Sequence, residues 1–156
     1  MGAGRVICVG APETPRLALA RRFGAHATVN IDELKTPHQR IERVRDIVGG
    51  FGADLVMDCA GHPSAGPEGI EFLRDGGTYV EMGQFTDAGS IMTSWHRICA
   101  KDINVIGSWG FTGNDLPLGV DMLYPFSEDG IDRAVADAMA MKTVKSTIVP
   151  WPELAG

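Results

Sequence analysis

Three short segments place glycine and small or polar residues directly after apolar runs. They are Cys59-Ala60-Gly61, Met82-Gly83-Gln84 and Gly107-Ser108-Trp109. Glycine allows a backbone to approach a ligand closely. If the apolar runs are parallel strands, these segments lie outside the carboxyl ends of the strands, where ligands of such sheets bind. The alternative is that the glycines only make turns.

Two Cys/His pairs have a spacing that occurs in metal sites: Cys59 with His62, and His96 with Cys99. A catalytic zinc needs three protein ligands and one open position. A lone pair of this kind is more often a core thiol beside a turn histidine, so we expect no zinc in this chain. Asp58 is the acid that ends one apolar run, and we expect it to cap the following turn. No catalytic residue is assigned.

Composition excludes several classes of function. The chain has 156 residues and a formal net charge of −6, which argues against a nucleic-acid binder because phosphate neutralisation needs a basic surface. No apolar run reaches the length of about 18 residues that a membrane span needs. The N-terminus does not have the layout of a signal peptide, and Cys8, Cys59 and Cys99 are widely spaced, as in reduced proteins. We therefore expect a cytoplasmic protein.

Short runs rich in valine and isoleucine alternate with helical patterns. The pattern predicts strands at residues 5–9, 27–29, 54–59, 78–82, 103–106 and 146–149, and helices at 12–23, 37–48, 63–73 and 129–141. Gly49-Gly50 is expected to end the second helix, and Gly76-Gly77 to form the turn after the third. In the last helix the expected buried face consists of Ile131, Val135, Ala138 and Met139. Such an alternation is typical of a doubly wound α/β fold with a parallel sheet.

The ordered series of segments resembles the nucleotide-binding domain of the zinc-type (medium-chain) alcohol dehydrogenases. The resemblance is carried by residues 6–10, by the pattern RL-x-x-A-x-x-x-GA at 16–25, and by the segments 27–30, 50–54, 56–61, 73–77, 81–83, 106–108 and 144–150. It implies a Rossmann-like domain over residues 1–150, with a C-terminal tail at 151–156. It also implies an oxidoreductase that uses NAD or NADP on alcohols, aldehydes or ketones.

Two departures from the family pattern stand out. In the family a strand and a G-x-G-x-x-G turn precede the region that this chain resembles. Met1-Gly2-Ala3-Gly4 looks like part of that turn, but it precedes a strand and Ile7 stands where the third glycine should be, so we interpret it as a chance match. The domain is therefore expected to lack its first strand and glycine-rich turn. Near Leu123-Tyr124, a further helix and short strand of the family are also absent.

The resemblance assigns further cofactor contacts. Gly10 stands where an acidic residue would hydrogen-bond the adenosine ribose of NAD, and Arg16 lies nearby in the sequence. Room for a 2′-phosphate favours NADP over NAD by a small margin. The alternatives are that Glu13 serves the ribose, or that Arg16 is only solvated. Lys145 matches a family residue that reaches the pyrophosphate; the alternative is a lysine that is only solvated at the surface.

The strand that the domain is expected to lack is the central one in the family's sheet order 3-2-1-4-5-6. Its absence would leave unpaired apolar edges, which proteins rarely leave bare. We expect either that residues 6–9 pair directly with 55–59, or that another subunit fills the gap. The expected partners are a nicotinamide dinucleotide and further copies of the chain, as a homo-oligomer.

Two functions remain open. The chain is either an alcohol dehydrogenase-like oxidoreductase, or a non-catalytic nucleotide-binding or assembly module of the same origin. A fold does not supply a function without its site.

Overall fold

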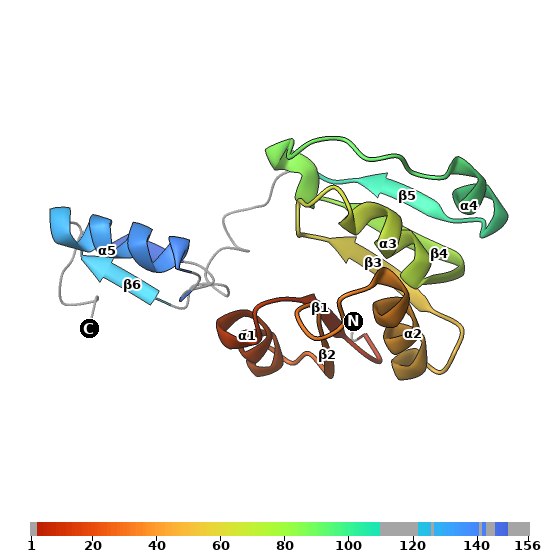
Figure 1. Ribbon diagram of the computed structural model, residues 1–156, viewed down its shortest axis with the longest axis horizontal. Helices are drawn as coiled ribbons and strands as arrows, with labels where there is room; N and C mark the ends of the chain where they lie inside the picture. Colours follow the sequence, from red (N-terminus) through yellow and green to blue (C-terminus); the bar gives the residue numbers. More distant parts are fainter. Residues whose placement is uncertain (1–2, 110–121, 126, 141, 143–145, 150–156) are drawn as a thin grey trace. The chain divides into compact units, whose positions relative to one another are not determined.

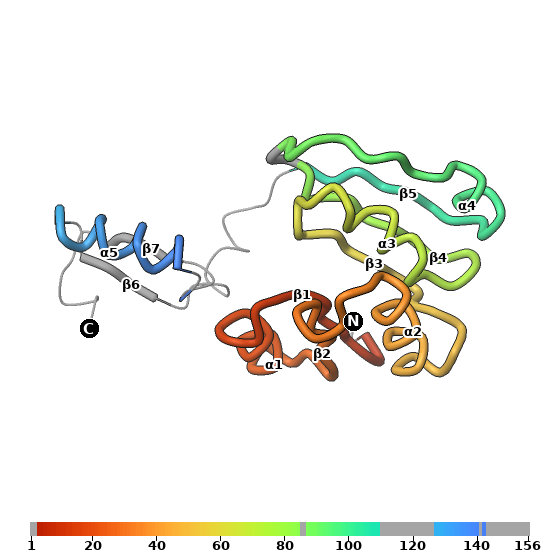
Figure 2. The backbone as a smooth tube through the Cα atoms, viewed as in Figure 1, coloured from red at the N-terminus to blue at the C-terminus, as the bar shows by residue number. Residues whose placement is uncertain are grey.

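The computed structural model describes residues 3–109, 122–125, 127–140, 142 and 146–149. Figures 1 and 2 show how these residues follow one another in helices and parallel strands. The chain divides into two compact units. One consists of Met1–Asp32 together with Phe111–Gly156, and the other of Glu33–Gly110.

The unit Glu33–Gly110 is built on a parallel sheet of three strands, β3 (Ala53–Asp58), β4 (Leu73–Glu81) and β5 (Asn104–Gly107), in the order β3-β4-β5. The register pairs Val56 with Tyr79 and Tyr79 with Val105. Because side chains alternate across a sheet, these three residues share one face. The predicted parallel sheet is confirmed.

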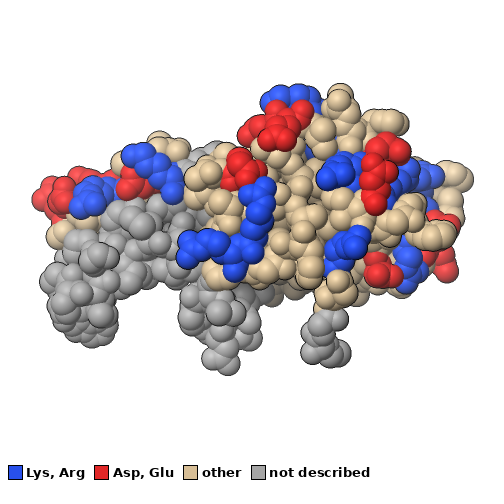
Figure 3. All heavy atoms as spheres, turned by 90° about the horizontal axis from the view of Figure 1, so that it is seen from below, with Lys and Arg blue, Asp and Glu red and all other residues tan. Residues whose placement is uncertain are grey.

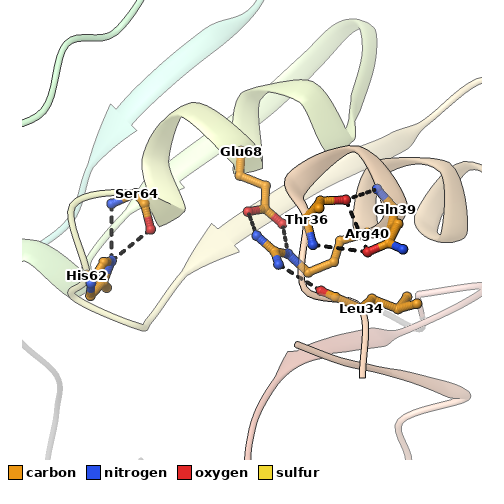
Figure 4. Close-up of polar contacts among 7 residues, drawn as sticks. All are labelled: Leu34, Thr36, Gln39, Arg40, His62, Ser64 and Glu68. Carbon is orange, nitrogen blue, oxygen red and sulfur yellow. Dashed lines mark hydrogen bonds and ion pairs between the residues drawn. The ribbon is translucent and has the colours of Figure 1, made fainter. Parts of the chain in front are cut away.

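Three helices accompany this sheet: α2 (Pro37–Val48), α3 (Ala65–Phe72) and α4 (Trp95–Ala100). Helix α2 begins at a capping box, in which the Thr36 hydroxyl accepts from Gln39 N and the Gln39 side chain accepts from Thr36 N (Figure 4). It ends at Gly49, whose φ of 84° is a left-handed conformation that glycine adopts readily. The prediction for 37–48 is confirmed at both ends.

Helix α3 packs against β3 and β4, and α2 packs beside α3 (Figure 1). Arg40 of α2 joins the helices, because its Nε and Nη2 donate to the two carboxylate oxygens of Glu68 at 2.5 Å each (Figure 4). The core of the unit consists of Ile70, Leu73, Tyr79 and Ile103. Gly69 of α3 faces this core, and a Cβ there would lie 2.7 Å from Cε2 of Tyr79.

Two features of this unit differ from the sequence prediction. The turn expected at Gly76-Gly77 lies inside β4, because α3 ends at Phe72 and Leu73 already pairs with Ala53. The register shifts before Leu55 pairs with Thr78, and Gly76, with a φ of 70°, takes up the extra residues as a glycine in a bulge does. Helix α4 was not predicted, since six residues are too few for a clear helical period.

In the other unit, β1 (Ile7–Gly10) pairs in parallel with β2 (Ala27–Asn30). The helix expected at 12–23 is only half present: an irregular turn η1 (Glu13–Leu17) precedes the α-helix α1 (Ala18–Arg22). Thr14 has extended angles (φ −117°, ψ 130°), because the residue before a proline is disfavoured in the helical region.

The same unit contains β6 (Met122–Pro125), α5 (Glu128–Met139) and β7 (Ser146–Val149), with β6 parallel to β7. The predicted helix and last strand are confirmed; β6 was not predicted. The predicted buried face of α5 is wrong, since Gly130 and Ala134 are buried while Val135 and Met139 are 53% and 82% exposed. Both sets recur at helical spacing, so periodicity alone does not decide which of them is buried.

The hydrogen-bonded ladders of the described strands are β1–β2, β3–β4–β5 and β6–β7. Within the described ranges, no helix is long and apolar enough to cross a membrane. On the face shown in Figure 3, basic and acidic side chains are interspersed over the described surface.

Candidate functional site

The three segments singled out in the sequence meet at one edge of the β3–β4–β5 sheet. Backbone hydrogen bonds continue past the strand ends: Met82 N donates to Asp58 O at 3.2 Å, and Ser108 N donates to Glu81 O at 2.8 Å. Residues 59–61, 82–84 and 107–109 therefore follow neighbouring strands at their carboxyl ends, as predicted. This is the position where ligands of open parallel sheets bind.

Asp58 shapes the first of these loops. Its side chain is buried, and Oδ1 accepts a hydrogen bond from Ala60 N at 2.8 Å. An aspartate that accepts from the backbone two residues on forms a local turn. The predicted role of Asp58 as a turn cap is confirmed.

Glu81 shapes the second loop in the same way. Its Oε1 accepts from Gly83 N at 2.9 Å and from Gln84 N at 3.0 Å. Sequence reasoning did not select Glu81. Its position in the sequence could have pointed to it: Glu81 is a polar residue near the end of a buried strand. It stands two positions after Tyr79, so the two side chains lie on one face of that strand.

The two loops are in close contact through glycine. A Cβ on Gly83 would lie 2.4 Å from Gly61 N and 2.9 Å from Ala60 N, distances at which something must move. Gly61 has a φ of 66°, where a side chain would be strained. Both glycines are buried, so their role is to bring the loops together and not to form the exposed surface.

The surface of this edge is formed by the remaining members of the three segments. Cys59, Ala60, Gly107, Ser108 and Trp109 are exposed, and Met82 and Gln84 are half-buried. Trp109 is 82% exposed. Open space surrounds Gly107, where a Cβ would meet no heavy atom within 4 Å. The edge thus offers small residues, backbone groups and one indole ring to a ligand.

The other predicted contacts fall elsewhere in the chain. Gly10 ends β1, and a Cβ there would lie 3.9 Å from Cδ2 of Leu17, an ordinary contact that leaves room for a side chain. Arg16 is exposed in η1. Glu13, the alternative ribose ligand, forms an ion pair with Arg21, and that hydrogen bond lowers the pKa of the Glu13 carboxyl. Lys145 lies outside the described residues.

The Cys/His pairs do not form a metal centre in the part of the chain that the structure describes. The His62 ring nitrogen Nδ1 makes a hydrogen bond with Ser64 Oγ at 2.8 Å (Figure 4). Among the described residues, no group of three His, Cys, Asp or Glu side chains is arranged to hold a metal. These residues do not fit a zinc site, and we derive no metal-dependent step.

A groove of about 200 Å³ lies on the helix face of the sheet, lined by Gly66, Ile70, Tyr79, Glu81, Thr93, Trp95, Ile98 and Val105. Its volume is below the roughly 300–1,000 Å³ of most ligand pockets. Of the loop-forming residues only Glu81 borders it. We regard the strand-end edge as the better candidate site, because topology and loop geometry agree there.

Comparisons with known proteins give one consistent result. The family model described as zinc-binding dehydrogenase matches residues 1–124. The chain is 38% identical over 95 residues to an erythritol/L-threitol dehydrogenase of Mycolicibacterium smegmatis, which covers 60% of this chain and 24% of that protein. It is 32% identical over 106 residues to a sorbitol dehydrogenase of Halalkalibacterium halodurans, a match that covers 67% of this chain and 29% of that protein. It is also 32% identical over 124 residues to a probable D-xylulose reductase A of Emericella nidulans, a match that covers 78% of this chain and 33% of that protein. The chain thus spans a third or less of the length of these relatives.

Solved structures show the same fold. An alcohol dehydrogenase from Thermotoga maritima superposes with a TM-score of 0.80 at 24% identity, over 96% of this chain and 44% of that one. Benzyl alcohol dehydrogenase from Acinetobacter calcoaceticus superposes with a TM-score of 0.75 at 21% identity, over 94% of this chain and 43% of that one. At these identities the likeness shows an α/β Rossmann-like fold, in agreement with the sequence prediction.

Proposed function

Because the chain belongs to the zinc-binding dehydrogenase family, we propose that it binds a nicotinamide dinucleotide at the edge formed by segments 59–61, 82–84 and 107–109. The observation that carries this proposal is the construction of the edge. Asp58 and Glu81 each use a carboxylate oxygen to hold a loop, and Gly83 fits against Gly61 where no side chain could. Loops held in this way form a preorganised surface, which lowers the entropic cost of binding.

The residues of this edge bind and orient; none of them is assigned to a chemical step. When bound, a nicotinamide dinucleotide carries the hydride of an alcohol–carbonyl interconversion. The exposed residues Cys59, Ala60 and Ser108 present the loop surface to the cofactor, while the buried carboxylate of Asp58 and the half-buried one of Glu81 hold the loops. Gly10 and Arg16 remain the proposed contacts for the adenosine ribose and its phosphate, with NADP slightly favoured over NAD.

The substrate class of the proposal is an alcohol or its carbonyl partner. Its relatives are named for erythritol or L-threitol, sorbitol and D-xylulose, all of which are polyhydroxylated. We therefore propose a polyol or the corresponding ketose as the substrate class. The alternative is a module that binds the nucleotide or assembles with partners without turnover.

Calorimetric titration of the purified chain with NADH and NADPH tests the proposal. We expect saturable binding of at least one cofactor, weakened tenfold or more in Gly83→Ala, because the new Cβ forces the two loops apart. Gly4→Ala is the matched control, since a Cβ there meets no atom within 4 Å. Absence of binding to the wild-type chain at millimolar cofactor would contradict the proposal. Turnover of a polyol by the chain would exclude the non-catalytic module.

A further inference from the structure

Tyr79 lies between the two carboxylates that shape the loops. Its hydroxyl oxygen is 2.9 Å from Asp58 Oδ2 and 3.0 Å from Glu81 Oε2. The second oxygen of each carboxylate accepts from the backbone of its loop. A continuous chain of hydrogen bonds therefore runs from the loop after β3, through the Tyr79 hydroxyl, to the loop after β4.

The ring of Tyr79 is fixed by its surroundings. The residue is 3% exposed and belongs to the core cluster. Helix α3 presents two glycines to it: a Cβ on Gly69 would lie 2.7 Å from the ring, and one on Gly66 would lie 3.6 Å from the hydroxyl. Glycine is a poor helix former, so its presence in α3 is best explained by the space that the ring occupies. A ring held in this way places its hydroxyl at one point.

The hydroxyl remains a donor at all physiological pH values. Burial, followed by the negative charge of Asp58, raises the pKa of Tyr79 far above its usual value. A hydroxyl has a single hydrogen, so Asp58 and Glu81 share one donor. Charged acceptors make such hydrogen bonds stronger than neutral ones, and the position of each carboxylate depends on the other through this hydrogen.

We propose that Tyr79 is a positioning residue that couples the loops after β3 and β4 and holds them in the arrangement that binds the dinucleotide. The link to binding rests on the function proposed above. The coupling of the loops does not, and it is measurable in the free protein.

Amide hydrogen exchange tests the coupling directly. In Tyr79→Phe the shared donor is lost, and we expect the amides of Ala60, Gly83 and Gln84 to exchange roughly tenfold faster or more. Thr36→Val is the matched control: it also removes one hydroxyl, in this case one that accepts from the backbone N–H of Gln39 at the start of α2. Unchanged exchange at both loops in Tyr79→Phe, or a change in one loop only, would overturn the proposal.

A second variant separates this hydrogen-bond route from general loosening of the sheet edge. Glu81→Ala removes the acceptor of Gly83 and Gln84 and leaves the Tyr79 hydrogen to Asp58 alone. We expect faster exchange at Gly83 and Gln84 with no loss of protection at Ala60. Equal loosening of both loops would mean that packing, and not Tyr79, connects them. This variant also keeps the proposal testable if Tyr79→Phe does not fold.

The effect of Tyr79 on cofactor binding is measured by titrating the same variants with NADH. We expect Tyr79→Phe to raise the dissociation constant roughly tenfold while Thr36→Val leaves it unchanged. If both loops loosen in exchange but NADH affinity is unaltered, the role of Tyr79 in binding is refuted although the coupling stands. If the wild-type protein binds neither NADH nor, in a parallel titration, NADPH, the proposed function fails, and the exchange data still decide on the coupling.

Discussion

Gly10 is the residue at which the choice between NAD and NADP can be tested with one substitution. It ends β1, and a side chain fits there because a Cβ would lie 3.9 Å from Leu17 Cδ2. We expect Gly10→Asp to shift the ratio of NADH to NADPH affinity towards NADH by roughly tenfold or more, because a carboxylate accepts from the ribose hydroxyls and repels a 2′-phosphate. Competition between the two cofactors in calorimetry measures the ratio. Gly4→Asp adds the same charge in open space, and an equal shift in that variant would contradict a local role of Gly10.

Glu71 gives a prediction about pH. Arg97 Nε and Nη2 donate to its two oxygens at 2.7 and 2.6 Å, and this hydrogen bonding lowers the pKa of Glu71 below its ordinary value of 4.5. A carboxyl with a lowered folded-state pKa stabilises the protein above its unfolded pKa, and the contribution is lost as pH falls through the folded one. The Arg97 side chain is 43% exposed, so we expect only about 1 kcal/mol.

Urea unfolding of wild type and Glu71→Gln at several pH values checks this contribution. The wild type should be more stable at pH 7, and the difference should shrink as the pH falls below 4.5. A difference that is the same at pH 7 and in acid would show that Glu71 acts through packing and not through its charge.

Among the elements, the packing of α2 beside α3 depends on the ion pair between Arg40 and Glu68. Their side chains are only 12% and 11% exposed, and Arg40 also donates to Leu34 O at 2.8 Å. Removing one partner of a buried pair leaves a charge without compensation, which costs roughly 3 kcal/mol or more. We expect this loss in the free energy of unfolding of Glu68→Gln, measured in urea. Glu42→Gln, which breaks the exposed pair with Arg45, should cost about 1 kcal/mol or less. Equal losses of unfolding free energy in the two variants would refute the proposed role of the Arg40–Glu68 pair.

The elements differ in how well the sequence predicts them, for local reasons. Helix α2 carries both its signals in its own sequence, Pro37 at the start and Gly49 at the end, and it was predicted correctly. Helix α4 is too short for a helical period to be read, and strand β6 ends in Pro125, a residue type that is depleted in strands. The predicted helix at 12–23 was wrong at Thr14, where the following proline outweighs the helical pattern.

The sequence predicted the loops of the candidate site but not the side chains that hold these loops. Parallel topology alone brings the three strand ends together, so segments 59–61, 82–84 and 107–109 could be grouped from sequence. The network of Asp58, Tyr79 and Glu81 could not, because it depends on the register that sets Val56 opposite Tyr79. The hydrophobic pattern decides which face of the sheet a side chain takes, but a shift by two residues keeps that face, so the sequence alone does not fix the cross-strand partner.

At the scale of the whole molecule, we propose that the chain associates with copies of itself. Leu55, Met57 and Ile106 are 53%, 54% and 50% exposed, and the register places Met57 and Ile106 on one face of the sheet, on either side of Val80. A parallel sheet is normally covered on both faces. Sedimentation equilibrium should give a mass above that of one 16.7 kDa chain, and Met57→Lys should lower it. A monodisperse monomer of the wild type would contradict the proposal.

The central claim is that the sheet edge at the ends of β3, β4 and β5 holds a nicotinamide dinucleotide. The most direct test is to follow the backbone amide resonances of the isotope-labelled chain by NMR while NADH or NADPH is added. We expect saturable shifts concentrated at residues 59–61, 82–84 and 107–109, with the exposed pair of Glu42 and Arg45 on α2 unaffected. Resonances that stay unchanged at millimolar cofactor, or shifts that gather away from these three segments, would contradict it.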